Sequence, residues 1–89
     1  MATVHIPPQM QELTGGLAEV EAEGKSLRQV VNHLETNYPG FSERLVREDM
    51  VAPGLAVSID NVVTSRGLFA EVSPASIIHI IPAISGGLL

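Results

Sequence analysis

The chain has 89 residues and a net charge of −5, and 45% of its residues are hydrophobic while 17% are charged. This length fits one small domain and excludes a second, and the hydrophobic content excludes a disordered chain. The absence of cysteine excludes a disulfide framework, a thiolate metal cluster and a cysteine nucleophile, and ten acidic against five basic residues argue against binding to nucleic acid.

Two strands are predicted at the start of the chain. Residues 3–6 alternate polar and apolar side chains and end before two prolines, which lack the N–H that a strand ladder needs. Residues 17–23 alternate small apolar residues with glutamates, after a pair of glycines at 15–16 that permits a reversal. We therefore expect a hairpin whose second strand is half buried.

A helix follows this hairpin. Ser26 can cap the first N–H groups of a helix, and Gln29 completes an S-x-x-Q capping box. The apolar residues then recur at helical spacing, at Leu27, Val30, Val31 and Leu34. The segment 37–40, with its proline and glycine, ends the helix. A short second helix is expected over 41–46, followed by a loop over 47–54.

The second half of the chain reads as strands. Residues 55–59 alternate, the pair Asp60-Asn61 favours a turn, and the β-branched 62–64 completes a hairpin. For residues 68–72 the sequence leaves two alternatives, a brief strand or an irregular connection. Residues 77–81 are apolar on both faces, as a central strand requires, and this strand stops at Pro82.

The order of elements predicts an α+β domain of the β-grasp (ubiquitin-like) class. The first and last strands would lie side by side in a mixed sheet, with one main helix packed across it and a short second helix. The alternative is a small ferredoxin-like fold, which needs a second long helix before the last strand, and the sequence offers none there. We expect a domain over 1–82 and a flexible C-terminal tail over 83–89.

The end of the chain carries the most specific motif. The segment 81–87, Ile-Pro-Ala-Ile-Ser-Gly-Gly, resembles the end of the ubiquitin-like sulfur carriers, a family that includes MoaD and ThiS. The blocks at 3–7, 13–16 and 34–45 most resemble the CysO branch, which serves cysteine biosynthesis. Glycines beyond a core gain nothing from packing and lose the most entropy on ordering, so a function rather than folding explains them.

The resemblance implies that this chain is a carrier and not an enzyme. An adenylating enzyme would use ATP to activate the carboxyl group of Gly87, which would then become a sulfur-donating thiocarboxylate, and the chain itself would bind no cofactor. Gly86 would provide clearance, because a side chain would collide in a narrow channel. Residues 83–87 span roughly 17 Å when extended, enough to reach into a partner that docks outside. A sulfur-accepting synthase would be a further partner.

Leu88 and Leu89 follow the glycines, and this departs from a finished carrier. Some relatives are trimmed after Gly-Gly by a zinc metallopeptidase, and we expect the same at the Gly87–Leu88 bond. Several alternatives stay open: a molybdopterin-synthase small subunit, a protein modifier that forms an isopeptide bond through Gly87, or a non-covalent interaction module whose tail is never activated. The sequence does not decide which acceptor receives the sulfur.

The remaining expectations concern partners and location. Strand alternation puts His5 and His79 on one open face, while His33 on the helix lies on the other side of the sheet, so no metal site is expected. The residues expected to dock partners lead into the tail: His79, Ile81, Pro82 and Ile84. No apolar run approaches the roughly 20 residues that span a bilayer, and we expect a cytoplasmic protein without membrane contact.

Overall fold

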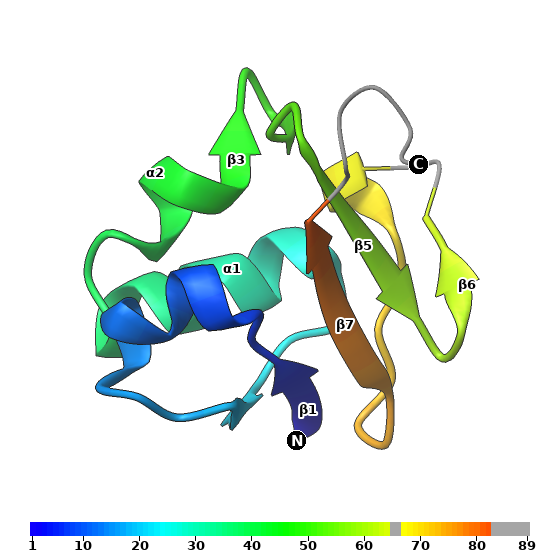
Figure 1. Ribbon diagram of the computed structural model, residues 1–89. Helices are drawn as coiled ribbons and strands as arrows, with labels where there is room; N and C mark the ends of the chain where they lie inside the picture. Colours follow the sequence, from blue (N-terminus) through cyan, green and yellow to red (C-terminus); the bar gives the residue numbers. More distant parts are fainter. Residues whose placement is uncertain (65–66, 83–89) are drawn as a thin grey trace.

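The computed structural model describes residues 1–64 and 67–82. A five-stranded mixed sheet forms its centre, in the order β2-β1-β7-β5-β6 (Figure 1). Its strands, in chain order, are β1 (Ala2–His5), β2 (Glu19–Ala22), β5 (Leu55–Ile59), β6 (Val62–Val63) and β7 (Ile77–Pro82). β1 and β7 are parallel neighbours, whereas the other pairs are antiparallel. This is the β-grasp arrangement that the sequence predicts.

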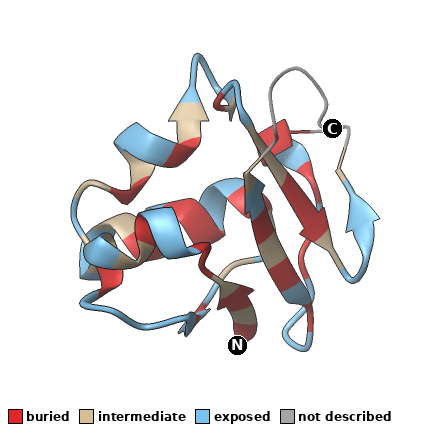
Figure 2. Ribbon diagram, viewed as in Figure 1, coloured by how far each residue is buried: buried red, intermediate tan, exposed pale blue. Residues whose placement is uncertain are grey.

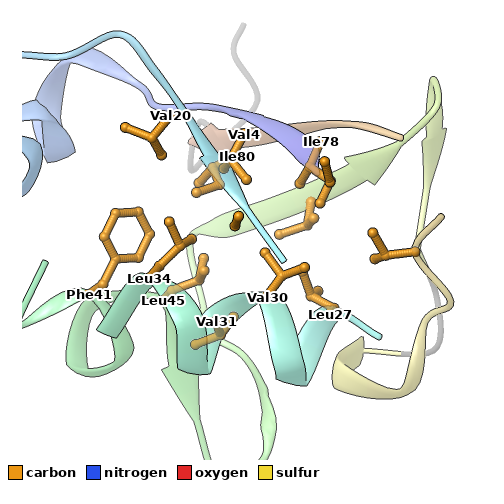
Figure 3. Packing of buried hydrophobic residues seen from close by; sticks show 14 of the residues in the cluster. Val4, Val20, Leu27, Val30, Val31, Leu34, Phe41, Leu45, Ile78 and Ile80 are labelled. Carbon is orange, nitrogen blue, oxygen red and sulfur yellow. The ribbon is translucent and has the colours of Figure 1, made fainter. Parts of the chain in front are cut away.

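Helix α1 (Leu27–Asn37) covers one face of the sheet, and the hydrophobic core fills the space between them. Figure 3 shows Leu27, Val30 and Leu34 pointing toward Val4 and Ile80 of the sheet. These five side chains are all at most 5% exposed. Burying an aliphatic side chain of this kind stabilises the folded state by about 1.5–3 kcal/mol. Aliphatic side chains therefore supply most of the packing in a chain that has no tryptophan. No helix in the part of the chain that the structure describes could span a membrane.

The start of α1 follows the predicted cap with one difference. The Ser26 hydroxyl accepts a hydrogen bond from the backbone N–H of Gln29 at 3.3 Å, as an N-cap residue does. In return, the Gln29 side chain accepts from the backbone N–H of Lys25 at 2.8 Å, one residue earlier than in the usual capping box. The reciprocal hydrogen bonds therefore involve both residues that precede the helix, Lys25 and Ser26, instead of the N-cap residue alone.

The connection between β1 and β2 differs from the expected tight turn. A 3-10 helix, η1 (Pro8–Thr14), lies between the two strands, and Gly15 ends it in the left-handed conformation. Met10 turns into the core from η1. Pro8 opens this helix, where a missing N–H costs nothing. The strands still pair as predicted, with Val4 opposite Val20.

The prediction of a loop over 47–54 is wrong. The short helix α2 (Phe41–Leu45) ends one residue before the predicted limit and leads into a small hairpin of β3 (Val46–Arg47) and β4 (Met50–Val51). Its two turn residues, Glu48 and Asp49, both have positive φ, which is the geometry of a two-residue hairpin turn. Val46 and Val51 pack against the core, so this hairpin extends the layer that covers the sheet.

Glu35 fixes the turn between α1 and α2. Its carboxylate accepts hydrogen bonds from the backbone N–H of Ser42 at 2.7 Å and of Gly40 at 3.1 Å. These bonds, the Ser42 one first, hold the pKa of Glu35 below its ordinary value. The turn places Phe41, which is completely buried, beneath α1. A half-buried glutamate thus sets the position of a core aromatic ring.

The second predicted turn is confirmed, and its aspartate does more than turn the chain. Asp60 and Asn61 both have positive φ between β5 and β6. The Asp60 carboxylate accepts from the backbone N–H of Ile77 and from the Ser76 hydroxyl, both at 2.9 Å, and so ties this turn to the start of β7. The segment 68–72, for which the sequence left two alternatives, contains the end of a 3-10 helix, η2 (Gly67–Phe69), and one isolated β-bridge from Glu71 to Ser26.

Candidate functional site

The described part of the candidate site is the root of the tail, where β7 ends. Pro82 lies opposite Leu55, and this is the last pair of residues in the β5–β7 ladder. A proline has no N–H to donate to a further ladder hydrogen bond. The predicted tail 83–89 lies outside the described residues. That includes the docking residue Ile84, the clearance residue Gly86, the carrier residue Gly87 and the cleavage site at Leu88. The structure therefore locates the platform from which these residues leave.

The residues of β7 alternate between the two faces of the sheet, as Figure 2 shows. Ile78 and Ile80 are buried beneath α1, whereas Ile77 and Ile81 are 46% and 40% exposed on the open face. His79 lies between these two exposed isoleucines. Of the three predicted docking residues that the structure describes, His79 and Ile81 therefore share the open face, whereas Pro82 follows them at the end of β7 and belongs by alternation to the other face.

His79 is stacked on His5 of the neighbouring strand. The two residues are register partners in the parallel β1–β7 pair, and their rings lie 4.4 Å apart between centroids at an angle of 9°. His5 Nδ1 also lies 3.5 Å from a carboxylate oxygen of Glu19, its register partner on β2. The predicted placement of both histidines on one open face is confirmed, and the stack orders the centre of that face.

The three histidines do not form a metal site. His33 lies on α1, on the opposite side of the sheet from the stacked pair. Within residues 1–64 and 67–82, no group of three or more histidine, cysteine or acidic side chains could hold a metal ion. A structural or catalytic zinc ion needs at least three protein ligands, and the stacked pair belongs to no such set among these residues.

The open face changes in character from one edge of the sheet to the other. Glu19 and Glu21 are exposed at the β2 edge. Toward β5 the face becomes apolar, because Ala56 is the register partner of Ile81. We call Ile77, His79, Ile81 and Ala56 the open-face strip. A partner that covers this strip would meet the exposed isoleucines on either side of the His79 imidazole, with carboxylates toward the β2 edge.

Sequence analysis missed Ile77 as a member of this strip. The alternation that placed Ile81 on the open face also places Ile77 there, because every second residue of β7 lies on the same face of the sheet. It missed the exposed residues Met50 and Phe69 as well. The alternation could have found Ile77, but no periodic signal exists for elements as short as β4 and η2.

Comparison with known proteins connects this geometry to a family. The model of the ThiS family matches residues 4–87, which includes both glycines. The sulfur carrier protein CysO of Mycobacterium tuberculosis is 37% identical over 92 residues, covering 96% of this chain and 97% of the relative. The resemblance stated from the sequence, to this family and to its CysO branch, is therefore confirmed.

Two solved structures agree with that match. The crystal structure of the Amycolatopsis orientalis BexX/CysO complex includes a chain with a TM-score of 0.91 and 32% identity, covering 98% of this chain and 100% of the other. The crystal structure of Mycobacterium tuberculosis CysO has a TM-score of 0.88 and 30% identity, covering 94% and 100%. The predicted fold is confirmed over nearly the whole chain.

Proposed function

Because the chain belongs to the ThiS family, we propose that it is a ubiquitin-like sulfur carrier whose Gly87 carboxyl group is converted to a thiocarboxylate, for use in cysteine biosynthesis. The observation that carries the proposal is the match of the family model through Gly87 on a β-grasp body whose last strand leads into that segment. The CysO match also supports our expectation that the chain is not an enzyme.

The chain contributes one reacting group, the carboxylate of Gly87. In the activation step, a carboxylate oxygen attacks the α-phosphorus of ATP in a partner enzyme, and pyrophosphate leaves. A sulfide-level sulfur nucleophile supplied by the host then attacks the acyl carbon, a C–S bond forms, and AMP leaves with the electron pair of the broken C–O bond. No redox change occurs at the chain, so no cofactor is needed on it. ATP-dependent activation fits a cytoplasmic protein.

Gly87 becomes available only when the bond to Leu88 is cut, because its carboxyl carbon otherwise belongs to a peptide bond. We propose that a zinc metallopeptidase hydrolyses this bond, water supplying the oxygen of the new carboxylate. Glycine is favoured on the acyl side of this bond because the backbone there must pass close to the walls of a narrow channel, and a Cβ at 86 or 87 would obstruct it. Trimming would therefore convert a precursor into a carrier.

The open-face strip supports docking of the partners beside the tail. Ile81 immediately precedes Pro82, so a surface that covers Ile81 holds the root of the tail in place. A fully extended segment of five residues such as 83–87 would span roughly 17 Å, at about 3.3–3.6 Å per residue. A CysO chain is part of a solved complex with BexX, and this supports a surface for protein partners on the present chain. The adenylating enzyme and a sulfur-accepting synthase would use this face in turn.

The decisive experiment compares the chain ending at Gly87 with the full sequence. Each is incubated with the adenylating enzyme of the same host, ATP, magnesium and a sulfide source, and intact mass is recorded. We expect an oxygen-to-sulfur exchange only on the chain that ends at Gly87. A Gly87→Ala variant, trimmed to the same length, is the matched control. An unmodified trimmed chain would contradict the proposal.

The same measurement separates the alternatives. A large adduct on lysine would indicate a protein modifier, and Lys25 is the one lysine on this chain that could itself be modified. Transfer of the sulfur to a molybdopterin precursor, in place of a cysteine precursor, would indicate a molybdopterin-synthase subunit. Mass spectrometry of the protein from its native host tests trimming directly, because molecules that all retain both leucines would exclude it.

A further inference from the structure

A second group of exposed side chains lies at the end of the molecule where β7 stops. Met50 on β4 is 60% exposed, Phe69 in η2 is 74% exposed, and Arg47 on β3 is also exposed. We call these three residues the exit-pole patch. β4 and η2 pack against each other, and both lie at the end of the sheet where β7 finishes (Figure 1).

The patch flanks the root of the tail. Leu55 is the register partner of Pro82, and it follows β4 through a turn in which its N–H donates to the Ala52 carbonyl at 3.1 Å. The hairpin β3–β4 packs on α2, in the layer that covers the sheet. Ile81, in contrast, faces the open side. The root of the tail therefore has an exposed apolar surface on each side.

Folding does not account for these exposed side chains. In the β3–β4 hairpin, Val46 and Val51 are register partners that pack against the core, so the other pair, Arg47 and Met50, faces outward. Leu68 anchors η2 at 2% exposure, which leaves Phe69 outside. The core would keep its packing if Met50 and Phe69 were polar.

Arg47 adds a charge to this apolar surface. Arg28 pairs with Asp49 at 3.0 Å and Arg44 pairs with Glu12 at 3.2 Å. Arg47 makes no ion pair or side-chain hydrogen bond within the described part of the chain, although Glu48 follows it in the turn. Aromatic residues, methionine and arginine are enriched in interfaces between proteins, and these are the three residue types of the patch.

We infer that the exit-pole patch is a docking surface for the adenylating enzyme, which meets it with an apolar hollow bordered by a carboxylate. The inference rests on the proposed function, because an enzyme that encloses residues 83–87 must cover the body around Pro82. Such an enzyme contacts the open-face strip on one side and the exit-pole patch on the other. The carboxylate partner follows from the Arg47 guanidinium, which pairs with no acidic side chain among residues 1–64 and 67–82, since a charge buried in an interface needs an opposite charge.

Kinetics with the host adenylating enzyme test this surface. We expect Arg47→Glu, in the chain that ends at Gly87, to raise the KM for adenylation about tenfold while kcat changes little, because the substitution alters docking and not the reacting acid. Lys25→Glu is the matched control, since it makes the same charge change at an exposed residue that borders the opposite end of β7. Met50→Ser should also raise KM, and Leu17→Ser, at a 50% exposed leucine, is its control.

Methionine methyl groups give a direct readout of contact. The chain has three methionines. Met50 belongs to the patch and Met10 is buried in the core. Met1 is 56% exposed and precedes β1, whose start lies beside the start of β7, at the end of the sheet opposite to the patch. In a chain with labelled methionine methyls, adding the unlabelled enzyme should shift the Met50 signal and leave the positions of the Met1 and Met10 signals nearly unchanged.

The outcomes separate this inference from the proposed function. A trimmed wild-type chain that is never adenylated would overturn both. If the wild-type chain is adenylated, but Arg47→Glu has the KM of Lys25→Glu and the Met50 signal moves no more than that of Met1, the docking surface alone is overturned. A KM increase confined to the patch variants, together with a selective Met50 shift, supports it.

Discussion

The two faces of the central sheet are made by the same strands and yet differ in how far their isoleucines are exposed. On the covered face, Ile78 and Ile80 are 1% and 5% exposed, whereas on the open face their neighbours Ile77 and Ile81 are 46% and 40% exposed. Because side chains alternate along a strand, each pair of adjacent residues divides between the two faces. The covered face holds the fold together, and the open face is left for other molecules.

This division leaves one face of the sheet free of the demands of the core. The core needs only one face of the sheet and the layer of α1, α2 and β3–β4 that covers it. The open-face strip and the exit-pole patch can therefore change with little effect on folding. Substitutions that compare the two faces test this separation.

The largest expected effect comes from removing a buried isoleucine. Ile78→Ala should lower the free energy of unfolding by about 2–5 kcal/mol, because it removes packed atoms and leaves a cavity beneath α1. Ile77→Ala, the same substitution one residue earlier on the open face, should cost less than about 1 kcal/mol. Urea unfolding of both variants measures the difference. Equal losses would show that the two faces do not differ in their contribution to stability.

A smaller effect is expected where the chain approaches the covering helix. A Cβ on Gly24 would lie 2.7 Å from the backbone nitrogen of Val30 and 2.9 Å from Cβ of Gln29, so the start of α1 would have to shift. Gly24→Ala should therefore lower the free energy of unfolding by about 1–3 kcal/mol. Gly15→Ala is the control, because it also has positive φ but its Cβ would meet nothing within 4 Å. A smaller loss at Gly24 than at Gly15 would contradict the close approach.

On the open face, the effect moves from stability to binding. Ile81→Asp should leave the free energy of unfolding within about 1 kcal/mol of the wild-type value and weaken docking of the adenylating enzyme about tenfold, roughly 1.4 kcal/mol of binding free energy. Ile80→Asp is the matched variant on the covered face and should unfold the domain. Circular dichroism and KM for adenylation measure the two effects. An unfolded Ile81→Asp would contradict the assignment of faces.

Strand alternation made the two faces predictable from the sequence. The long strands carry enough residues for a period of two to show, and the turn at Asp60-Asn61 uses residues that tolerate positive φ. These signals predicted the buried isoleucines and the placement of His5 and His79, whereas the strand order came from the order of elements, with the first and last strands side by side as in a β-grasp domain. They also gave α1, whose apolar residues repeat at helical spacing.

The hairpin β3–β4 could not be predicted for a physical reason. Two-residue strands are too short to show a period, and the turn between them uses Glu48 and Asp49 at positive φ, where asparagine and glycine are the usual residues. Pro53 and Gly54 then suggested a loop. Only the packing of Val46 and Val51 against the core selects the hairpin, and such tertiary contacts are not visible in a short segment.

The tail shows a different limit. Physical reasoning from the sequence predicts that Gly86 and Gly87 add nothing to a core, but the chemistry assigned to them came from resemblance. The residues of the exit-pole patch carry no motif at all. Their grouping depends on how β4 and η2 meet beside the end of β7, which the sequence order alone does not specify.

The smallest expected effect concerns pH and the turn that positions Phe41 on the covered face. Since backbone hydrogen bonds from Ser42 and Gly40 lower the pKa of Glu35 in the folded state, the ionised carboxylate stabilises the fold above its ordinary pKa. This stabilisation is lost as pH falls through the pKa of the folded state. Glu35→Gln should therefore be less stable than wild type at pH 7 and approach it in acid. Urea unfolding at stepwise lower pH measures this convergence. A pH-independent gap for Glu35→Gln would mean that the turn depends on the shape of the side chain and not on its charge.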